Sequence, residues 1–227
     1  MDRERSFHVI ARIHTDFPTK FGIPRQSGLI EDLKAEIIFE PEYRNADALR
    51  GIEEFSHLWL IWEFSESVRE GWSPMVRPPR LGGNKRVGVF ATRSPFRPNP
   101  IGLSSVRLNS VELHKEKGPV LHVSGADMMD GTPIFDIKPY LPFVDSRADA
   151  TEGYTKRTKE YALQVEIAQE LLEQMEAEKR EALKAILAND PRPSYQNDPD
   201  RVYGLEFAGH EIRFTVRNGV LTVTEIQ

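Results

Sequence analysis

The residues best suited to chemistry lie in four loops rich in proline, glycine and polar side chains. The longest runs from Ala91 to Gly102 (ATRSPFRPNPIG) and combines three prolines with Arg93 and Arg97. Each proline fixes its own φ and lacks a backbone donor, so this loop is stiff and pairs poorly with strands. Such loops hold polar side chains ready for a ligand at a low ordering cost. The other three are Ile23–Gly28 (IPRQSG), Arg77–Arg86 (RPPRLGGNKR) and Met129–Tyr140 (MDGTPIFDIKPY).

Simple chain reversal is the alternative explanation for each loop, because proline and glycine also form the corners of β-barrels. Four such loops in one region favour a ligand site. The common catalytic patterns are missing: there is no glycine-rich nucleotide loop after a strand and no cysteine, and the six histidines show no metal-ligand spacing. We therefore expect no metal and no thiolate chemistry.

Positive charge gathers around the same loops. Between Gly71 and Val111 the chain holds seven basic residues and no acidic one, although the net charge is −5. A local field of that sign attracts phosphates and predicts a nucleic-acid partner. An ordinary cationic face balanced by acidic neighbours is the alternative. The residues expected to face nucleic acid are Arg77, Arg80, Lys85, Arg86 and Arg97.

The composition, 39% hydrophobic and 29% charged, is typical of a soluble globular protein. The longest apolar run, Leu58 to Trp62, is too short to span a bilayer. The first residues lead into no apolar signal region, and the lack of cysteine fits a reducing compartment. We expect a cytoplasmic protein without a membrane segment.

Short strands must position these loops. Apolar and β-branched runs predict strands at 7–14, 33–40, 55–64, 86–91, 103–113, 120–125 and 134–138. Because no helices alternate with these strands, the pattern predicts an antiparallel barrel or a strongly curled sheet.

The character of the chain changes after residue 149. Residues 155–188 are rich in Glu, Lys, Ala and Leu and predict two helices, or one helix with an exposed middle. Three short strands follow, and Asn218-Gly219 is a strong hairpin signal. The expected fold is mainly β (α+β), with an antiparallel barrel-like N-terminal domain over residues 1–150. A small C-terminal α/β domain over residues 151–227, made of helix and β-hairpin, is expected to follow it as an appendage.

Five segments of the chain resemble the TrmO family, also called TsaA-like proteins. The match covers nearly the whole sequence in the expected order, and its central motif is long and unusual. The segments are GIPRQSG, FSHLW, VRPPRLGGNKRVGVFATRSPFRPNPIGLS, DGTPIFDIKPYLPF and DPRPSY. The resemblance implies a β-barrel that binds S-adenosylmethionine and forms a homodimer with cofactor sites near the subunit interface. It also implies methylation of the exocyclic amine of threonylcarbamoyladenosine at position 37, in the anticodon loop of threonine tRNA.

The resemblance also implies which residues bind the cofactor. Arg25 or Arg93 is suited to the methionine carboxylate, and Asp130 to the amino group or ribose hydroxyls. Backbone groups at Leu58, Leu103 and Gly131 are suited to the adenine edge. For His57, a place in the protein core is the alternative. The implied positions are Pro24, Arg25, Gln26, His57, Leu58, Arg93, Leu103, Asp130, Gly131, Thr132 and Pro133.

The remaining expectations concern catalysis and tRNA. The acceptor nitrogen is a poor nucleophile, so Asp136 or Tyr140 is expected to help remove its proton; an ion pair with Lys138 is the alternative for Asp136. Arg192 and Tyr195 of the DPRPSY segment are expected to contact tRNA. The competing function is a non-catalytic RNA- or nucleotide-binding protein that retains the fold.

Overall fold

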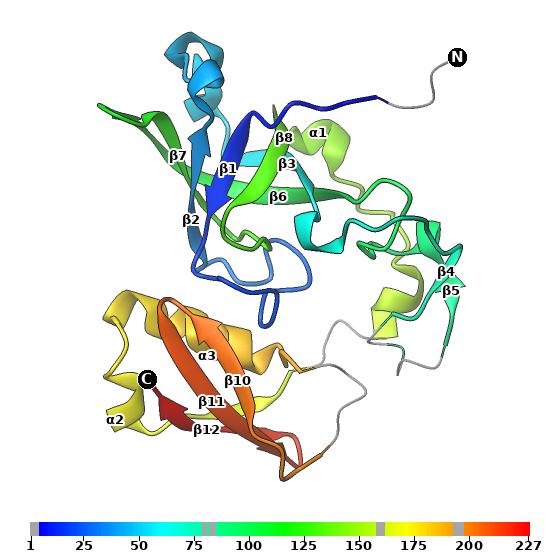
Figure 1. Cartoon of the computed structure of the whole chain (residues 1–227), viewed down its shortest axis with the longest axis vertical. Helices are drawn as coiled ribbons and strands as arrows, with labels where there is room; N and C mark the ends of the chain where they lie inside the picture. Colours follow the sequence, from blue (N-terminus) through cyan, green and yellow to red (C-terminus); the bar gives the residue numbers. More distant parts are fainter. Residues whose placement is uncertain (1–4, 79–80, 82–84, 158–161, 193–197) are drawn as a thin grey trace.

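The computed structural model describes residues 5–78, 81, 85–157, 162–192 and 198–227 (Figure 1). Six antiparallel strands close into a barrel in the order β1-β2-β7-β6-β3-β8. They are β1 (Ala11–His14), β2 (Lys34–Phe39), β3 (His57–Glu63), β6 (Ile101–His114), β7 (Gly118–Ser124) and β8 (Thr132–Pro139). The predicted mainly β fold with an antiparallel barrel is thereby confirmed.

Alternation along the strands places one face of each in the barrel interior. In β3 (HLWLIWE), Leu58, Leu60 and Trp62 are buried, while the residues between them are partly exposed. Ile13 on β1 and Ile37 on β2 are fully buried in the same core. Burial of these side chains is the main force that closes the barrel.

Short elements decorate the barrel. A two-stranded ribbon joins β4 (Met75–Val76) to β5 (Val87–Gly88), and α1 (Pro142–Asp145) follows β8. The strand predicted at 86–91 is wrong beyond residue 88, because Val89–Ala91 turns into a 3₁₀ helix. The other 3₁₀ helices among the described residues are Pro41–Tyr43, Ala46–Leu49, Ile52–Glu54, Ser65–Ser67, Gly153–Arg157 and Ala177–Lys179.

The C-terminal part is a four-stranded sheet in the order β10-β11-β12-β9. Its strands are β9 (Gln164–Glu166), β10 (Tyr203–Phe207), β11 (His210–Arg217) and β12 (Val220–Ile226), and its helices are α2 (Gln169–Leu172) and α3 (Arg180–Ala188). The helical prediction for 155–188 fails at β9, which pairs in parallel with β12. Pairing with a distant strand overrides the local helical composition there.

The loop between β1 and β2 lies between the barrel and the C-terminal sheet (Figure 1). Phe17 of this loop packs against Phe207 with ring centroids 5.3 Å apart, and Asp16 forms an ion pair with Lys179. Ile30 and Leu33 join the same apolar cluster as the C-terminal sheet. The loop that carries Pro24 to Gln26 is therefore held from both sides.

Among the described residues, no helix is long and apolar enough to cross a membrane.

Candidate cofactor site

Three connections leave the barrel at one end, which we call the loop end. Strand pairing places Ile13 of β1 beside Thr132 of β8, and Glu63 of β3 beside Ile101 of β6. Lys34 of β2 likewise faces Ser124 of β7. Because neighbouring strands are antiparallel, the connections 15–33, 64–100 and 125–131 must emerge together. These segments carry most of the positions predicted to bind the cofactor.

The proline-rich loop is held together by its own side chains. Arg97 donates from Nη1 to the carbonyl of Thr92 at 3.1 Å and to that of Ser94 at 3.4 Å. The Thr92 hydroxyl donates to the carbonyl of Val89 at 2.8 Å. Arg97 was predicted to face tRNA; its guanidinium donates to carbonyls of its own loop, and the tRNA contact stays a prediction. Its main structural effect is to fix the shape that presents Arg93.

The end of this loop is fixed by Trp62. A Cβ placed on Gly102 would lie 2.2 Å from the Trp62 ring, so only glycine lets the indole pack there. Trp62 Nε1 donates to Ser104 Oγ at 2.9 Å, and both side chains are buried. The glycine of the PNPIG segment and the first serine of β6 thus anchor the loop to β3.

A second set of contacts joins the β1–β2 loop to the proline-rich loop. Arg93 Nη1 donates to Gln26 Oε1. The backbone N–H of Ser105 donates to Ser27 Oγ at 3.1 Å. Arg25 and Arg93 are both exposed, while Pro24 is buried. Gln26 and Arg93, two predicted cofactor positions from distant parts of the sequence, are therefore in direct contact. The arginines beside this contact, Arg25 and Arg93, are exposed to solvent.

Asp127, in the β7–β8 connection, is the residue that sequence reasoning missed. It accepts a hydrogen bond of 2.6 Å from Ser104 Oγ. Burial raises the pKa of the Asp127 carboxyl, and hydrogen bonds from Ser104 and from the backbone of Ser27, with the charge of Arg93, oppose that rise. An acidic residue inside the buried run from Ser124 to Met128 is the signal that was available.

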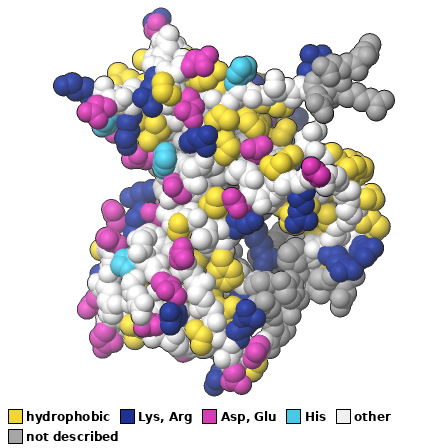
Figure 2. Space-filling view, viewed as in Figure 1, with side chains coloured by type: hydrophobic (Ala, Val, Ile, Leu, Met, Phe, Trp, Pro, Cys, Tyr) yellow, Lys and Arg dark blue, Asp and Glu magenta, His cyan; other side chains and the backbone are white. Residues whose placement is uncertain are grey.

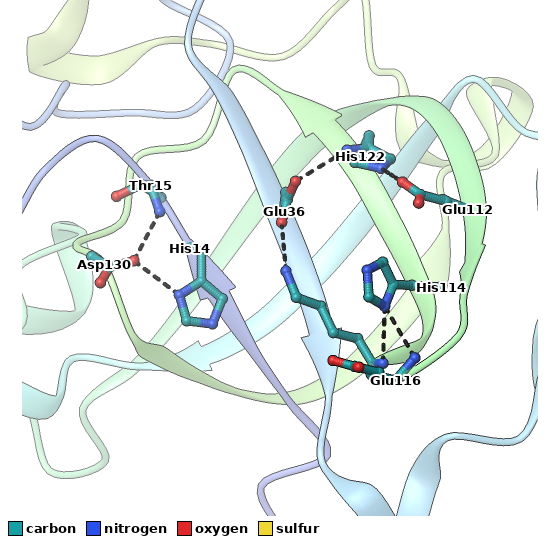
Figure 3. Close-up of polar contacts among 9 residues, drawn as sticks. His14, Thr15, Glu36, Glu112, His114, Glu116, His122 and Asp130 are labelled. Carbon is teal, nitrogen blue, oxygen red and sulfur yellow. Dashed lines mark hydrogen bonds and ion pairs between the residues drawn. The ribbon is translucent and has the colours of Figure 1, made fainter. Parts of the chain in front are cut away.

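Asp130 lies at the same end, next to β1. Its carboxylate accepts from the backbone N–H of Thr15 at 3.1 Å and lies 3.2 Å from His14 Nδ1 (Figure 3). The Asp130 and His14 side chains are each about half exposed. The carboxylate is thus oriented by the protein yet open to a ligand.

The rest of the DGTP segment is engaged within the chain. The N–H of Gly131 donates to Ile13, and its carbonyl accepts from Arg12 Nη1 at 3.1 Å. Thr132 is buried and its hydroxyl donates to the carbonyl of Met129 at 2.7 Å. Pro133 is also buried. These residues shape the turn that presents Asp130.

His57 and Leu58 lie far from the loop end in the same chain. His57 begins β3, six residues from Glu63, which is about 20 Å along a strand. Leu58 is fully buried between β6 and β8. The backbone N–H of Tyr140 donates to His57, and the Tyr140 ring packs against Trp59. The structure therefore groups His57 with Tyr140 at the opposite end of the barrel. Leu103, near the start of β6, is exposed at the loop end.

Asp136 occupies the middle of β8, where it pairs with Ile61. Its carboxylate lies 2.7 Å from Lys138 Nζ and accepts from the backbone N–H of Ile137 at 2.9 Å. The ion pair with Lys138, the alternative considered for Asp136, is thus present in the structure. A catalytic role for Asp136 or Tyr140 remains a prediction.

Basic and apolar side chains gather over β4 and β5 (Figure 2). Arg77, Lys85 and Arg86 are exposed, and none forms an ion pair within the part of the chain that the structure describes. Arg80 and Tyr195 lie outside the described residues. Exposed apolar side chains in the same region are Val68, Trp72, Met75, Phe90 and Phe96.

Arg192, unlike the exposed basic residues over β4 and β5, is buried. It is only 6% exposed, and it donates to Asp190 through Nε at 2.8 Å and Nη2 at 3.0 Å. The guanidinium stabilises the turn after α3 through this pairing, and the tRNA contact expected of Arg192 stays a prediction. Among the described residues there is no cluster of three or more His, Asp or Glu side chains that would hold a metal ion.

Two family models cover most of the chain. The tRNA-methyltransferase O N-terminal domain matches residues 12–146, and the TrmO C-terminal domain matches residues 160–227. The tRNA (adenine(37)-N6)-methyltransferase of Escherichia coli is 40% identical over 97% of this chain and 97% of its own length. A Pseudomonas aeruginosa protein named "Putative S-adenosylmethionine-dependent methyltransferase RcsF" is 40% identical over 88% of this chain and 87% of its own.

A solved structure agrees with these matches. The crystal structure of TrmO from Pseudomonas aeruginosa aligns with a TM-score of 0.80 and 31% identity, covering 99% of this chain and 98% of that one. The likeness extends over the barrel and the C-terminal sheet together. The chain belongs to the TrmO family.

Proposed function

We propose that this chain is an S-adenosylmethionine-dependent tRNA methyltransferase that methylates the exocyclic N6 nitrogen of adenine 37. The observation that carries the proposal is the match to the Escherichia coli tRNA (adenine(37)-N6)-methyltransferase over 97% of both chains. This activity has a physical counterpart in the structure, because three loops with exposed polar side chains meet at the loop end. The finer substrate is adenine already carrying a threonylcarbamoyl group.

The residues present at the loop end fit the cofactor. The exposed guanidiniums of Arg25 and Arg93, with the Gln26 amide beside Arg93, form a donor set suited to a carboxylate. The half-exposed Asp130 is suited to an ammonium group or to hydroxyls. When bound, S-adenosylmethionine supplies a methyl group from its sulfonium. The chain's contribution is to hold donor and acceptor in line, since alignment at close contact supplies much of the rate acceleration.

The tRNA surface is assigned to the basic residues beside this end. Arg77, Lys85 and Arg86 are exposed without acidic partners among the described residues, so their charge is available to phosphates. Binding that depends on them will weaken steeply as salt rises. We place the anticodon loop here, with the C-terminal part, residues 151–227, as an appendage that extends the tRNA surface of the barrel domain, residues 1–150.

A homodimer is proposed on the exposed apolar patch formed by Val68, Trp72, Met75, Phe90 and Phe96. Phe90 is 73% exposed and Trp72 53%, and their rings lie 5.9 Å apart. Contiguous exposed apolar surface of this kind marks protein interfaces. Sedimentation of the wild type and of Phe90→Ser tests this assignment: a dimer that becomes a monomer supports it, and an unchanged state contradicts it.

The cytoplasm, where tRNA is modified, is the proposed location.

The function is tested by mass spectrometry of nucleosides from threonine tRNA after incubation with the protein and S-adenosylmethionine. A gain of one methyl group on the modified adenosine supports the proposal. Parallel reactions with tRNA lacking the threonylcarbamoyl group decide whether that modification is required. Cofactor and tRNA binding without any methyl transfer favours the alternative, a non-catalytic RNA-binding protein with the same fold.

A further inference from the structure

We propose that Asp127 is a positioning residue that joins the three loops of the cofactor site through its hydrogen bond to Ser104 and the adjoining contact between Ser105 and Ser27. The inference rests on the proposed function, because it assigns a purpose to Asp127 within that site. Asp127 itself lies in the β7–β8 connection, between Ser124 at the end of β7 and Asp130. Three contacts carry the argument.

The first contact reaches the proline-rich loop. Ser104 Oγ donates to Asp127 Oδ1 at 2.6 Å, and Trp62 Nε1 donates to the same hydroxyl at 2.9 Å. An indole N–H only donates, so the hydroxyl accepts from Trp62 and must pass its own proton toward Asp127. The direction of this hydrogen-bond chain is therefore fixed, and the group at its end, Asp127, has to be an acceptor. Trp62 also covers Gly102, so the same chain holds the exit of the proline-rich loop.

The second contact reaches the β1–β2 loop. The Ser27 hydroxyl accepts from the backbone N–H of Ser105, the residue that follows Ser104, at 3.1 Å. The backbone of Ser27 also helps to lower the pKa of the Asp127 carboxyl. A nearby backbone bond, from Gly28 N–H to the carbonyl of Gly125 at 2.9 Å, runs in parallel. Asp127 thus fixes the residue that directly follows Gln26.

The third step leads to the ligand-facing side chains. Gln26 accepts from Arg93 Nη1, so fixing Ser27 also fixes the pair of side chains assigned to the cofactor. Arg93 adds favourable charge at the Asp127 carboxylate. Asp127 is half-buried and acts on the cofactor through these groups. A carboxylate suits the position because the Ser104 hydroxyl must donate to it; an asparagine can instead turn its NH₂ toward that hydroxyl.

The test compares Asp127→Asn with a matched control, Asp145→Asn. Asp145 also accepts from a tryptophan, Trp59 Nε1 at 3.0 Å, and from a backbone N–H, that of Leu141 at 2.8 Å, but after the opposite end of β8. We expect Asp127→Asn to weaken S-adenosylmethionine binding roughly tenfold and to raise its KM similarly. The KM for tRNA should stay unchanged. Asp145→Asn should leave all three constants as in the wild type.

Titration calorimetry with S-adenosylmethionine, run well below the Tm of each variant, provides the readout. Equal cofactor affinity in Asp127→Asn and wild type overturns the inference, as does an equal loss in Asp145→Asn. Ser104→Ala, which keeps the carboxylate and removes one donor, must weaken cofactor binding in the same direction if Asp127→Asn does not fold. Failure of the wild type itself to bind S-adenosylmethionine would instead overturn the proposed function.

Discussion

The two ends of the barrel are anchored by similar chemistry yet differ in what they expose. At the loop end, Trp62 Nε1 donates a hydrogen bond to Ser104 Oγ, and Ser104 Oγ donates one to Asp127. At the opposite end, Trp59 donates directly to Asp145, and Arg44 ties the carbonyls of Phe39 and Glu116 together at 2.9 and 3.2 Å. Both ends are therefore well ordered by side-chain hydrogen bonds.

The two ends differ in the predicted cofactor positions that they expose. At the loop end, Arg25, Arg93 and Asp130 remain exposed on segments that are already fixed. Preorganised charged groups bind a ligand without a further ordering cost. A functional end is thus recognised by exposed polar groups held on anchored loops, rather than by the number of hydrogen bonds. The predictions below separate anchoring from ligand binding.

The largest effect is expected from Gly102→Ala. Its new Cβ would lie 2.2 Å from the buried Trp62 ring, so the variant should lose about 3 kcal/mol of unfolding free energy. Gly88→Ala is the matched control, because Gly88 has a φ of −60° and no atom within 4 Å of its Cβ position. Urea unfolding measures both. Similar stabilities for the two variants would show that Trp62 does not anchor the loop.

Asp136→Asn tests the predicted role in proton removal of Asp136, which lies on β8 between the two ends of the barrel. If Asp136 assists proton removal, the variant should lower kcat about 100-fold and change cofactor affinity much less. Lys138→Met is the control, since it breaks the ion pair and leaves the carboxylate in place. Single-turnover methylation kinetics give the answer. An unchanged methylation rate in Asp136→Asn removes this residue from the mechanism and leaves the ion pair as its role.

Arg93→Gln and Arg44→Gln contrast the two ends directly. Loss of the Arg93 guanidinium should weaken S-adenosylmethionine binding roughly 30-fold, about 2 kcal/mol, with little change in stability. Arg44→Gln should lower the unfolding free energy by about 1 kcal/mol and leave cofactor affinity intact, since Arg44 holds only backbone carbonyls. Calorimetry and urea unfolding on both variants check the contrast. Equal cofactor affinities would erase the proposed difference between the ends.

The smallest effect concerns pH and Asp145. Hydrogen bonds from the Leu141 N–H and the Trp59 indole lower the pKa of the Asp145 carboxyl below its ordinary value of 3.8. The folded state therefore binds fewer protons than the unfolded state near that pH. The stability that Asp145 contributes is present above pH 3.8 and is lost as the pH falls through the lowered pKa. In urea unfolding at a series of acidic pH values, Asp145→Asn should show a shallower decline than wild type; parallel curves would contradict this.

The sequence predicted the barrel and its loops well, because alternation and proline content are local signals. It did not reveal at which end of a strand each residue lies. His57 and Gln26 were grouped by resemblance, whereas strand register places His57 some six residues from the loop end of β3. Asp127 was missed because its hydrogen-bond partner, Ser104, is distant in sequence. Arg192 was expected to contact tRNA, and its buried pairing with Asp190 could not be foreseen because it depends on the turn after α3.

The central claim is that the loop end binds the cofactor. The most direct measurement is a crystal structure of the protein with S-adenosylhomocysteine. We predict that the carboxylate of the ligand lies within hydrogen-bond distance of Arg93 or Arg25, beside Gln26, with Asp130 near its amino group or ribose. A ligand bound away from Gln26 and Arg93, with these side chains still exposed to solvent, would contradict the account.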